Sequence, residues 1–219
     1  MGRAPRPLRV IVTRAAGQVE PLAGRIEALG HDVVVSPLIE LEPVGPERIA
    51  GDAYDWVVVT SPFAARELMR RLDGDLPRLA AIGPGTAGAL GEHGLEPDLV
   101  PRVSTQEGLL AEFPRPPGRV LFAGAERARR LLVDELDAEF VPLYRTRALC
   151  PDPPPEGDLV VLASASAAEA LGQLGLDLPA VSIGPETTRA ARDAGVRIVA
   201  EADTHDLDGL VAAVARAAV

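Results

Sequence analysis

The sequence predicts an α/β protein made of two similar lobes, each built around a doubly wound parallel sheet. Three observations lead to this prediction. Short apolar runs alternate with helical patterns along the chain, the residues able to form a core are mostly aliphatic, and motifs from one half recur in the other. A strand followed by a helix, repeated many times, is typical of βαβ units whose strands are buried between helices.

Composition supports this fold class. A chain of 219 residues is long enough for one large domain or two small ones. The apolar fraction of 47% permits a sizeable buried core, and aromatic residues make up only 3%. The core must therefore consist of Val, Leu, Ile and Ala, which suits helix-covered parallel sheets better than a β-sandwich.

The strand candidates are short apolar runs, and most are separated by helical stretches. The first is Arg9–Thr13, and a helix is predicted after it over Gln18–Leu29, where apolar residues recur at helical spacing. The further strand candidates are, in order, Asp32–Ser36, Trp56–Thr60, Leu79–Ile82, Arg119–Ala123, Phe140–Leu143, Leu159–Ala163, Ala180–Ile183 and Arg197–Ala200.

An internal repeat predicts that the two lobes are copies of one unit. Ile82–Thr86 (IGPGT) recurs as Ile183–Thr187 (IGPET), 101 residues later. Upstream, VVVTSPFAA at 57–65 resembles VVLASASAA at 160–168. The chain is therefore interpreted as a duplicated unit of roughly 105 residues.

Proline-rich segments occupy the same place in each repeat and are predicted to be linkers. They are Pro37–Pro46 and Pro142–Pro155, and their first residues match, Pro37–Ile39 with Pro142–Tyr144. The repeat alone leaves two packings open. Each repeat could form its own domain, or the opening βαβ of one could dock with the closing part of the other.

Charge and residue usage exclude several classes of function. The formal net charge is −10, so nucleic acid and anionic membranes are expected to be poor partners. All 22 basic residues are arginine, which excludes a lysine Schiff base, a P-loop lysine and the usual pyridoxal phosphate anchor. No dinucleotide-binding fingerprint is present.

The sequence predicts a cytoplasmic protein. Cys150 is the only cysteine, so no intrachain disulfide and no cysteine-based zinc site are expected. The N-terminal residues lack an apolar stretch long enough for a signal peptide, and no later segment reaches membrane-spanning length. His31, His93 and His205 lack the spacing of metal ligands and are expected to be ordinary loop or helix-end histidines.

The loops that follow the strands carry the candidate site residues, because ligands of open parallel sheets bind beyond the carboxyl ends of the strands. Most of these loops contain small residues just before a helix, where free N–H groups and the helix dipole can hold a carboxylate or phosphate. The candidates for substrate binding are Arg14, Ser61, Phe63, Thr86, Ser164, Ser166 and Thr187.

A purely structural role is the alternative for most of these residues. Ser61 and Ser164 could be plain helix N-caps, and Gly-Pro-x-Thr is also an ordinary way to begin a helix. Arg14 directly follows a strand at the ligand edge, which favours a functional role. Tyr144 lies in a linker, where it could pack between the lobes or present a phenol able to donate a proton.

Taken together, these residues resemble the uroporphyrinogen-III synthase family. The resemblance lies in the order and spacing of short motifs along nearly the whole chain, since no single motif is very specific. The matching motifs are Val12-Thr13-Arg14, Pro37-Leu38-Ile39, Thr60-Ser61 with Ala64-Ala65, Ile82-Gly83 with Thr86-Ala87, Glu107-Gly108-Leu109, Tyr144 with Thr146, Ser164, Ile183-Gly184 with Thr187, and Gly209-Leu210.

The resemblance implies how the lobes are divided. The family's fold implies one lobe from residues 1–36 and 146–219, a second lobe from 41–141, and two linkers, 37–40 and 142–145, that run side by side as a hinge.

The resemblance also implies the reaction. The substrate would be hydroxymethylbilane, a linear tetrapyrrole carrying several carboxylates, and the enzyme would remove its terminal hydroxyl as water, close the ring and invert the last pyrrole. Tyr144 matches the family's functionally implicated tyrosine, while the seven residues named above would hold substrate. No metal or organic cofactor is implied, and a monomer is expected.

Two positions depart from the family pattern. Ala163 stands before Ser164 where the first repeat has Thr60, and Phe63 occupies a position where several relatives carry a polar or basic residue. Two other functions stay open: a non-enzymatic bilobal tetrapyrrole-binding protein, and a nucleotide-using enzyme. The missing lysine and missing fingerprint disfavour the latter.

Overall fold

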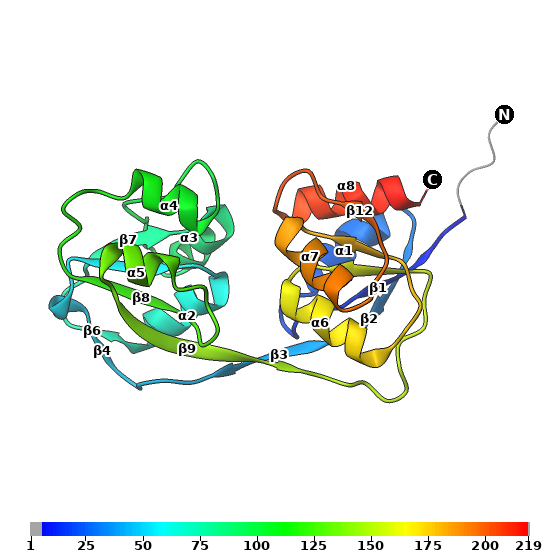
Figure 1. Cartoon of the computed structure of the whole chain (residues 1–219), viewed down its shortest axis with the longest axis horizontal. Helices are drawn as coiled ribbons and strands as arrows, with labels where there is room; N and C mark the ends of the chain where they lie inside the picture. The colour runs from blue at the N-terminus through cyan, green and yellow to red at the C-terminus, as the bar shows by residue number, and fades with distance from the viewer. Residues whose placement is uncertain (1–5, 219) are drawn as a thin grey trace. The chain divides into compact units, whose positions relative to one another are not determined.

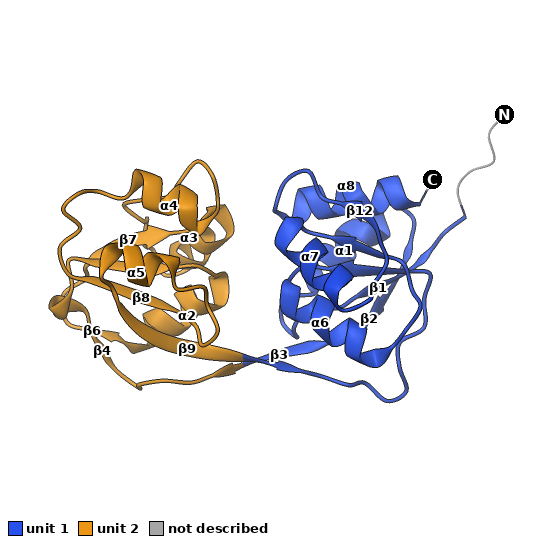
Figure 2. Ribbon diagram, viewed as in Figure 1, with its two compact units in different colours: residues 1–41, 146–219 blue, residues 42–145 orange. Residues whose placement is uncertain are grey.

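The computed structural model describes residues 6–218, so residues 1–5 and 219, which belong to the predicted first lobe, lie outside it. The N-terminal part of the signal-peptide prediction falls on those residues. The chain divides into two compact units, which Figure 2 distinguishes by colour. Unit 1 comprises residues 1–41 and 146–219, and unit 2 comprises residues 42–145.

Unit 1 is a three-layer α/β unit with a five-stranded parallel sheet in the order β12-β11-β10-β1-β2 (Figure 1). Helices α1 and α8 pack on one face, and helices α6 and α7 pack on the other. Its elements are β1 (Arg9–Val12), α1 (Glu20–Ala28), β2 (Asp32–Val35), β10 (Leu159–Leu162), α6 (Ala165–Leu174), β11 (Ala180–Ser182), α7 (Pro185–Asp193), β12 (Ile198–Glu201) and α8 (Leu207–Ala217).

Alternate residues of the strands build the two halves of this core. Val10 and Val12 face α1 and α8, whereas Ile11 between them faces the layer of α6 and α7, and all three are fully buried. Burial on both faces explains why the strands read as continuous apolar runs in the sequence.

Unit 2 has the same plan. Its sheet order is β3-β9-β8-β5-β7, and β5, β7, β8 and β9 pair in parallel. Helices α4 and α5 cover one face around Phe122, and α2 and α3 pack beside each other against β5 and β7. The elements are β4 (Ile49–Ala50), β5 (Trp56–Val59), α2 (Pro62–Arg71), β6 (Leu72–Asp73), β7 (Arg78–Ala81), α3 (Pro84–Gly91), α4 (Gln106–Glu112), β8 (Val120–Ala125), α5 (Leu131–Leu136) and β9 (Glu139–Ala148).

The fold class predicted from the sequence is confirmed, and each of the nine strand candidates overlaps a strand. The two segments expected to be proline-rich linkers contain more strand than was predicted, since β3 was not expected and β9 extends beyond the candidate Phe140–Leu143. β3 (Ile39–Pro43) pairs with β9. The pairing is antiparallel, since the Val44 N–H donates to Leu143 and the Leu149 N–H donates to Leu38.

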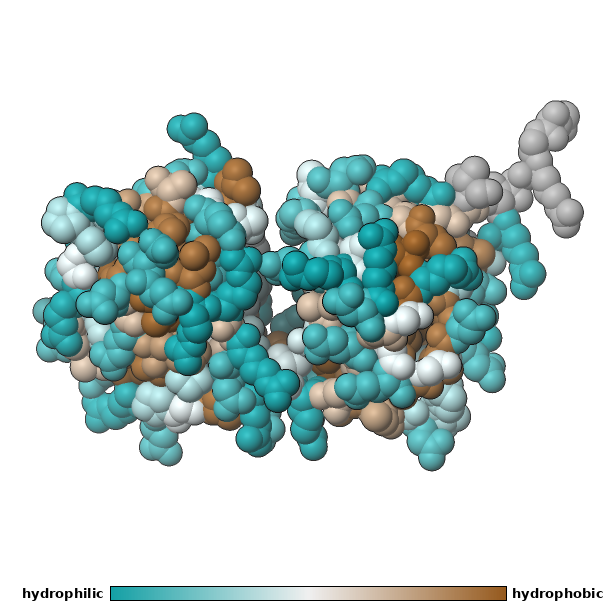
Figure 3. All heavy atoms as spheres, in the orientation of Figure 1, coloured by the Kyte–Doolittle hydropathy of each residue, from teal (hydrophilic) through white to brown (hydrophobic). Residues whose placement is uncertain are grey.

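Hydrophilic residues dominate the face of each unit that Figure 3 shows, with hydrophobic residues in small groups among them. The exposed large hydrophobic side chains belong to different elements and loops, for example Val35, Val103 and Val199. Among the described residues, no helix is long and apolar enough to cross a membrane.

Candidate functional site

In each sheet there are two adjacent strands whose following connections run in opposite directions. Candidate residues lie in the loops after these strands. In unit 1 the strand order runs outward from β1 to β2 on one side and from β10 to β11 and β12 on the other. The loops after β1 and β10 therefore diverge at the carboxyl edge, which is where doubly wound folds bind ligands. Arg14 follows β1 and Ser164 follows β10.

Arg14 is a half-buried cation without a carboxylate partner. Its Nη2 donates to the Gln18 side chain at 3.3 Å, which is the only hydrogen bond or ion pair it makes among residues 6–218. Burial lowers the pKa of its guanidinium from the usual value. A partly desolvated arginine that lacks an acidic partner is suited to receive an anionic ligand.

The other unit 1 candidates lie at helix starts on the same edge. Ser164 is the N-cap of α6 and accepts the Ala167 N–H at 3.2 Å, and Ser166 is the second residue of that helix. Thr187 is the third residue of α7 and is only 4% exposed. The structure thus gathers Arg14, Ser164, Ser166 and Thr187 along the carboxyl edge of one sheet.

Unit 2 repeats this arrangement. Ser61 is the N-cap of α2 and accepts the Ala64 N–H at 3.1 Å, and Phe63 is the second residue of α2. Thr86 is the third residue of α3 and is 3% exposed. Ser61 and Ser164 therefore cap helices, as the structural alternative predicted. Any role in binding a ligand would be additional to capping.

Tyr144 lies beside the other unit 2 candidates because the register of the sheet shifts next to it. β9 pairs with β8 so that Gly124 is opposite Pro142 but Ala125 is opposite Tyr144. This register shift is a β-bulge, which can re-aim a side chain. The Tyr144 hydroxyl lies 3.1 Å from Ser61 Oγ.

The ring of Tyr144 is held as well as its hydroxyl. Phe63 packs against it edge to face, with 5.0 Å between ring centroids and an interplanar angle of 70°. The residue is 8% exposed. Burial raises the pKa of the Tyr144 phenol above the usual value, and the hydrogen bond with Ser61 opposes that shift. The phenol is therefore protonated at neutral pH and able to act as an acid.

Helices α3 and α7 begin without a side-chain cap. Their N-caps are Gly83 and Gly184, and neither helix has a side-chain hydrogen bond at its start. Among the described residues, the hydroxyls of Thr86 and Thr187 in their first turns also lack a hydrogen-bond partner. Free N–H groups and an unpaired hydroxyl at a helix N-terminus suit the carboxylate of a ligand.

Two residues at these helix starts were missed from the sequence. A Cβ added to Gly83 would lie 2.5 Å from Ser104 Oγ, and one added to Gly184 would lie 2.8 Å from His205 Cδ2. His205, expected to be an ordinary loop histidine, therefore borders the start of α7. The sequence could have indicated both residues, because Ser104 and His205 are separated by the same 101 residues as the repeated Gly-Pro loops.

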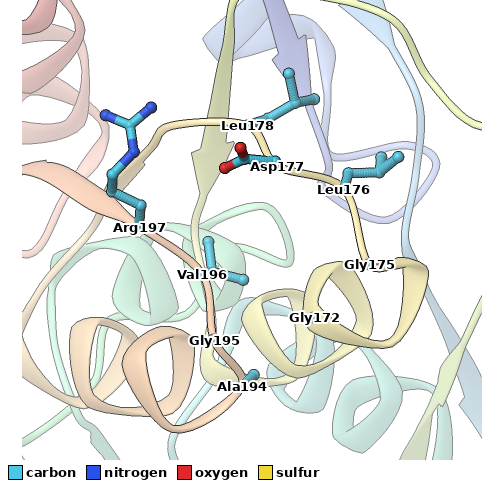
Figure 4. A pocket seen from close by; sticks show the side chains of 9 residues that line it. All are labelled: Gly172, Gly175, Leu176, Asp177, Leu178, Ala194, Gly195, Val196 and Arg197. Atoms are coloured by element: carbon cyan, nitrogen blue, oxygen red, sulfur yellow. The ribbon is translucent and has the colours of Figure 1, made fainter.

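A pocket in unit 1 lies elsewhere. It is lined by the last residues of α6, the turn after α7 and the loop before β11, with the Asp177 and Arg197 side chains beside it (Figure 4). These residues precede β11 and β12, so the pocket is at the amino edge of the sheet. None of the predicted site residues lines it.

Comparison with known proteins identifies the family of the chain. The family model described as Uroporphyrinogen-III synthase HemD matches residues 20–212. The uroporphyrinogen-III synthase of Synechococcus elongatus is 29% identical over 94% of this chain and 93% of its own. A putative uroporphyrinogen-III synthase of Methanothermobacter thermautotrophicus is 36% identical over 45% of this chain and 44% of its own.

Solved structures share the fold. The uroporphyrinogen-III synthetase of Helicobacter pylori superposes with a TM-score of 0.65 at 16% identity, covering 95% of this chain and 98% of its own. A mutant uroporphyrinogen III synthase of Thermus thermophilus gives 0.62 at 21% identity, with the same coverage. Since the family model spans most of its length, this chain belongs to the uroporphyrinogen-III synthase family.

Proposed function

We propose that this enzyme converts hydroxymethylbilane into uroporphyrinogen III, closing the ring with loss of water and inverting the last pyrrole, and is thus a cyclising hydro-lyase of tetrapyrrole synthesis. Membership of the family supports the substrate and product. Within the structure, the main support for the proposal is the phenol of Tyr144. It is buried and protonated, and it is hydrogen-bonded to Ser61 at the carboxyl edge of the unit 2 sheet.

Tyr144 is proposed to protonate the leaving hydroxyl of the substrate. The carbon–oxygen bond then breaks with its electron pair going to oxygen, water departs, and the adjacent pyrrole nitrogen supplies electrons to the carbon left behind. The resulting protonated azafulvene is attacked by the substituted carbon of the last ring, which gives a spiro-pyrrolenine. The bond from that carbon to its original methylene bridge then breaks, which leaves a second protonated azafulvene on the neighbouring ring. The unsubstituted α-carbon of the last ring attacks that methylene, so the last ring is inverted. A proton released when the rings regain aromaticity returns to the phenolate. General acids typically contribute about 10²–10⁴-fold, and a phenol, which is a weak acid at neutral pH, is expected to contribute less, about tenfold.

The remaining candidates are proposed to hold the acetate and propionate groups. Arg14 would supply positive charge, and the free starts of α3 and α7, with Thr86 and Thr187, would supply N–H and hydroxyl donors. Ser61, Ser164, Ser166 and Phe63 would line the same edges. Holding the substrate in one geometry favours attack at the substituted carbon over simple end-to-end closure.

The reaction involves no net redox change, and the proposal includes no metal or organic cofactor. We further propose that the enzyme acts in the cytoplasm as a monomer, with neither nucleic acid nor membrane as a partner. Its strongly negative net charge supports the last point.

An isomer assay tests the proposed function. Hydroxymethylbilane is generated, the purified protein is added, and the oxidised products are separated by chromatography, with heat-denatured protein as the control. Uncatalysed closure gives the type I ring. An excess of type III over the denatured control is expected. Type I alone from folded protein would overturn the enzyme assignment, and tetrapyrrole binding without turnover would then support the binding-protein alternative.

A further inference from the structure

The helix cap uses only part of the hydrogen-bonding capacity of the Ser61 hydroxyl. A serine hydroxyl offers one donor and two acceptor sites. One acceptor site takes the Ala64 N–H at 3.1 Å, which is the N-cap bond of α2. The remaining donor is within reach of the Tyr144 oxygen, 3.1 Å away.

The duplicated unit shows that the cap does not require a tyrosine. Ser164 occupies the place of Ser61 in unit 1 and accepts the Ala167 N–H at 3.2 Å. The residue matching Tyr144 there is Ile39, a buried apolar side chain in the core of unit 1. The pairing of a capping serine with a phenol is therefore specific to unit 2.

Other contacts fix the phenol so that its hydroxyl has little freedom. Phe63 packs on the ring edge to face. The Tyr144 carbonyl accepts the Glu126 N–H at 2.8 Å, which holds the backbone on the bulged side of β9. In unit 1 the residue matching Phe63 is Ser166, so the aromatic contact is also confined to unit 2.

We infer that Ser61 is a positioning residue for Tyr144. Its O–H donates to the phenol oxygen, so that the phenol's own proton points away from Ser61 and toward the leaving hydroxyl of the substrate. When that proton has been transferred, the same O–H stabilises the phenolate oxygen that remains. This inference rests on the proposed function, in which Tyr144 is the acid.

The electrostatics of the pair agree with this arrangement. Burial raises the pKa of the Tyr144 phenol, which keeps it protonated but would make it a poor acid by itself. The hydrogen bond with Ser61 lowers that pKa again. Losing the Ser61 hydroxyl should therefore leave a phenol that is still protonated but gives up its proton less readily.

A double-mutant cycle on the intact enzyme tests the inference. The variants are Ser61→Ala, Tyr144→Phe and the combination, each assayed for the rate of type III formation. Thr105→Ala is the matched control, because Thr105 caps α4 in the same unit by accepting the Gly108 N–H. We expect Ser61→Ala to slow the wild type about threefold, which is less than the loss of the phenol itself, because the phenol stays in place. In the Tyr144→Phe background it should slow the reaction no more than Thr105→Ala does.

Two further measurements separate positioning from capping. In Ser61→Ala the alkaline limb of the kcat profile should move to higher pH, whereas in Thr105→Ala it should stay in place. Ser61→Thr, which restores a hydroxyl and remains a good cap, should recover most of the rate. Ser61→Gly serves if Ser61→Ala does not fold, since glycine is a better helix N-cap than alanine.

The outcomes are distinct. Equal losses from Ser61→Ala with and without Tyr144, or an unmoved alkaline limb, would overturn the positioning role while leaving the synthase assignment intact. A wild-type protein that makes no excess of type III would overturn the proposed function itself.

Discussion

Gly85 and Glu186 occupy the same position in two equivalent helices, each directly after the proline that begins the helix. The starts of α3 and α7 are both uncapped by side chains, yet only α7 carries a carboxylate in its first turn. A carboxylate there competes with an anionic ligand for the same N–H groups and for the positive end of the helix dipole. The start of α3 is therefore expected to bind a substrate carboxylate more strongly than the start of α7.

Gly85→Glu is expected to raise the KM for hydroxymethylbilane about fivefold, since a charge at a helix start is worth roughly 0.3–1 kcal/mol, and more when partly buried. The side chain has room, because an added Cβ would meet only Pro62 Cγ, at 3.9 Å. Gly91→Glu is the matched control: it adds the same charge to α3 roughly 9 Å along the helix. Equal KM values for the two variants would contradict the assignment.

Arg14→Gln is expected to raise KM about tenfold and to leave the free energy of unfolding nearly unchanged, because Arg14 has no acidic partner to lose. Steady-state kinetics at increasing salt would check this, since an exposed part of the attraction weakens as charges are screened. Arg25→Gln is a suitable control, because Arg25 pairs with Asp208. A KM unchanged in Arg14→Gln would place Arg14 outside the substrate site.

Tyr144→Phe is expected to lower kcat about tenfold while type III stays the main product. The phenol assists departure of the hydroxyl, whereas the geometry of the bound substrate selects the isomer. Tyr54→Phe removes the other tyrosine of the chain, which interacts with Glu139 and Arg119, and should leave kcat unchanged. A Tyr144→Phe variant with wild-type kcat would exclude the phenol as the acid.

High pH is expected to affect both stability and rate through Tyr144. Its folded-state pKa lies above the usual value of 10.0. Its contribution to stability is therefore fully present below about pH 10 and is lost as the pH rises through the folded pKa. The pKa of Tyr54 is raised to about 12, so it contributes in the same direction. Urea unfolding between pH 9 and 11 should show a decline that is smaller in Tyr144→Phe; an identical decline would contradict the burial argument.

Glu67 is expected to stabilise unit 2 strongly. Its carboxylate, in a side chain only 5% exposed, accepts hydrogen bonds from Arg70 at 2.7 Å and Arg71 at 2.8 Å. Arg71 is itself nearly buried and also donates to the Val44 carbonyl. Glu67→Gln should lower the free energy of unfolding by about 3 kcal/mol, because it leaves a buried guanidinium underpaired.

Chemical denaturation with Glu92→Gln alongside would check the prediction for Glu67. Glu92 makes an exposed ion pair with Arg66, so its loss should scarcely move the unfolding midpoint. Equal shifts in the two variants would show that burial does not strengthen the Glu67 interactions.

The sequence predicted the parallel strands well, because a strand buried on both faces must be apolar throughout, as in Leu159–Leu162. It did not predict β3 or the length of β9, because prolines usually mark loops. Pro43 ends an edge strand and Pro142 precedes a bulge, which are the positions where a sheet tolerates proline.

The sequence placed the candidate residues at the carboxyl edges of the strands, but it could not predict the hydrogen bond between Ser61 and Tyr144. These residues are 83 apart, and their contact depends on the bulge in β9. Spacing along the chain contains no information about such a register shift. The division of the candidates between two units likewise required the sheet order.

The chain enters unit 2 through β3 and leaves it through β9, and because these strands pair, unit 2 is an insertion between the two segments of unit 1. The register that joins Val44 to Leu143 and Leu38 to Leu149 sets Leu41 opposite Thr146, at the point where the chain passes from one unit to the other. A two-residue turn such as Asn-Gly could join those residues as a hairpin and yield unit 1 as one continuous polypeptide. Residues 42–145 are already continuous, so the two units can be designed as separate polypeptides and compared.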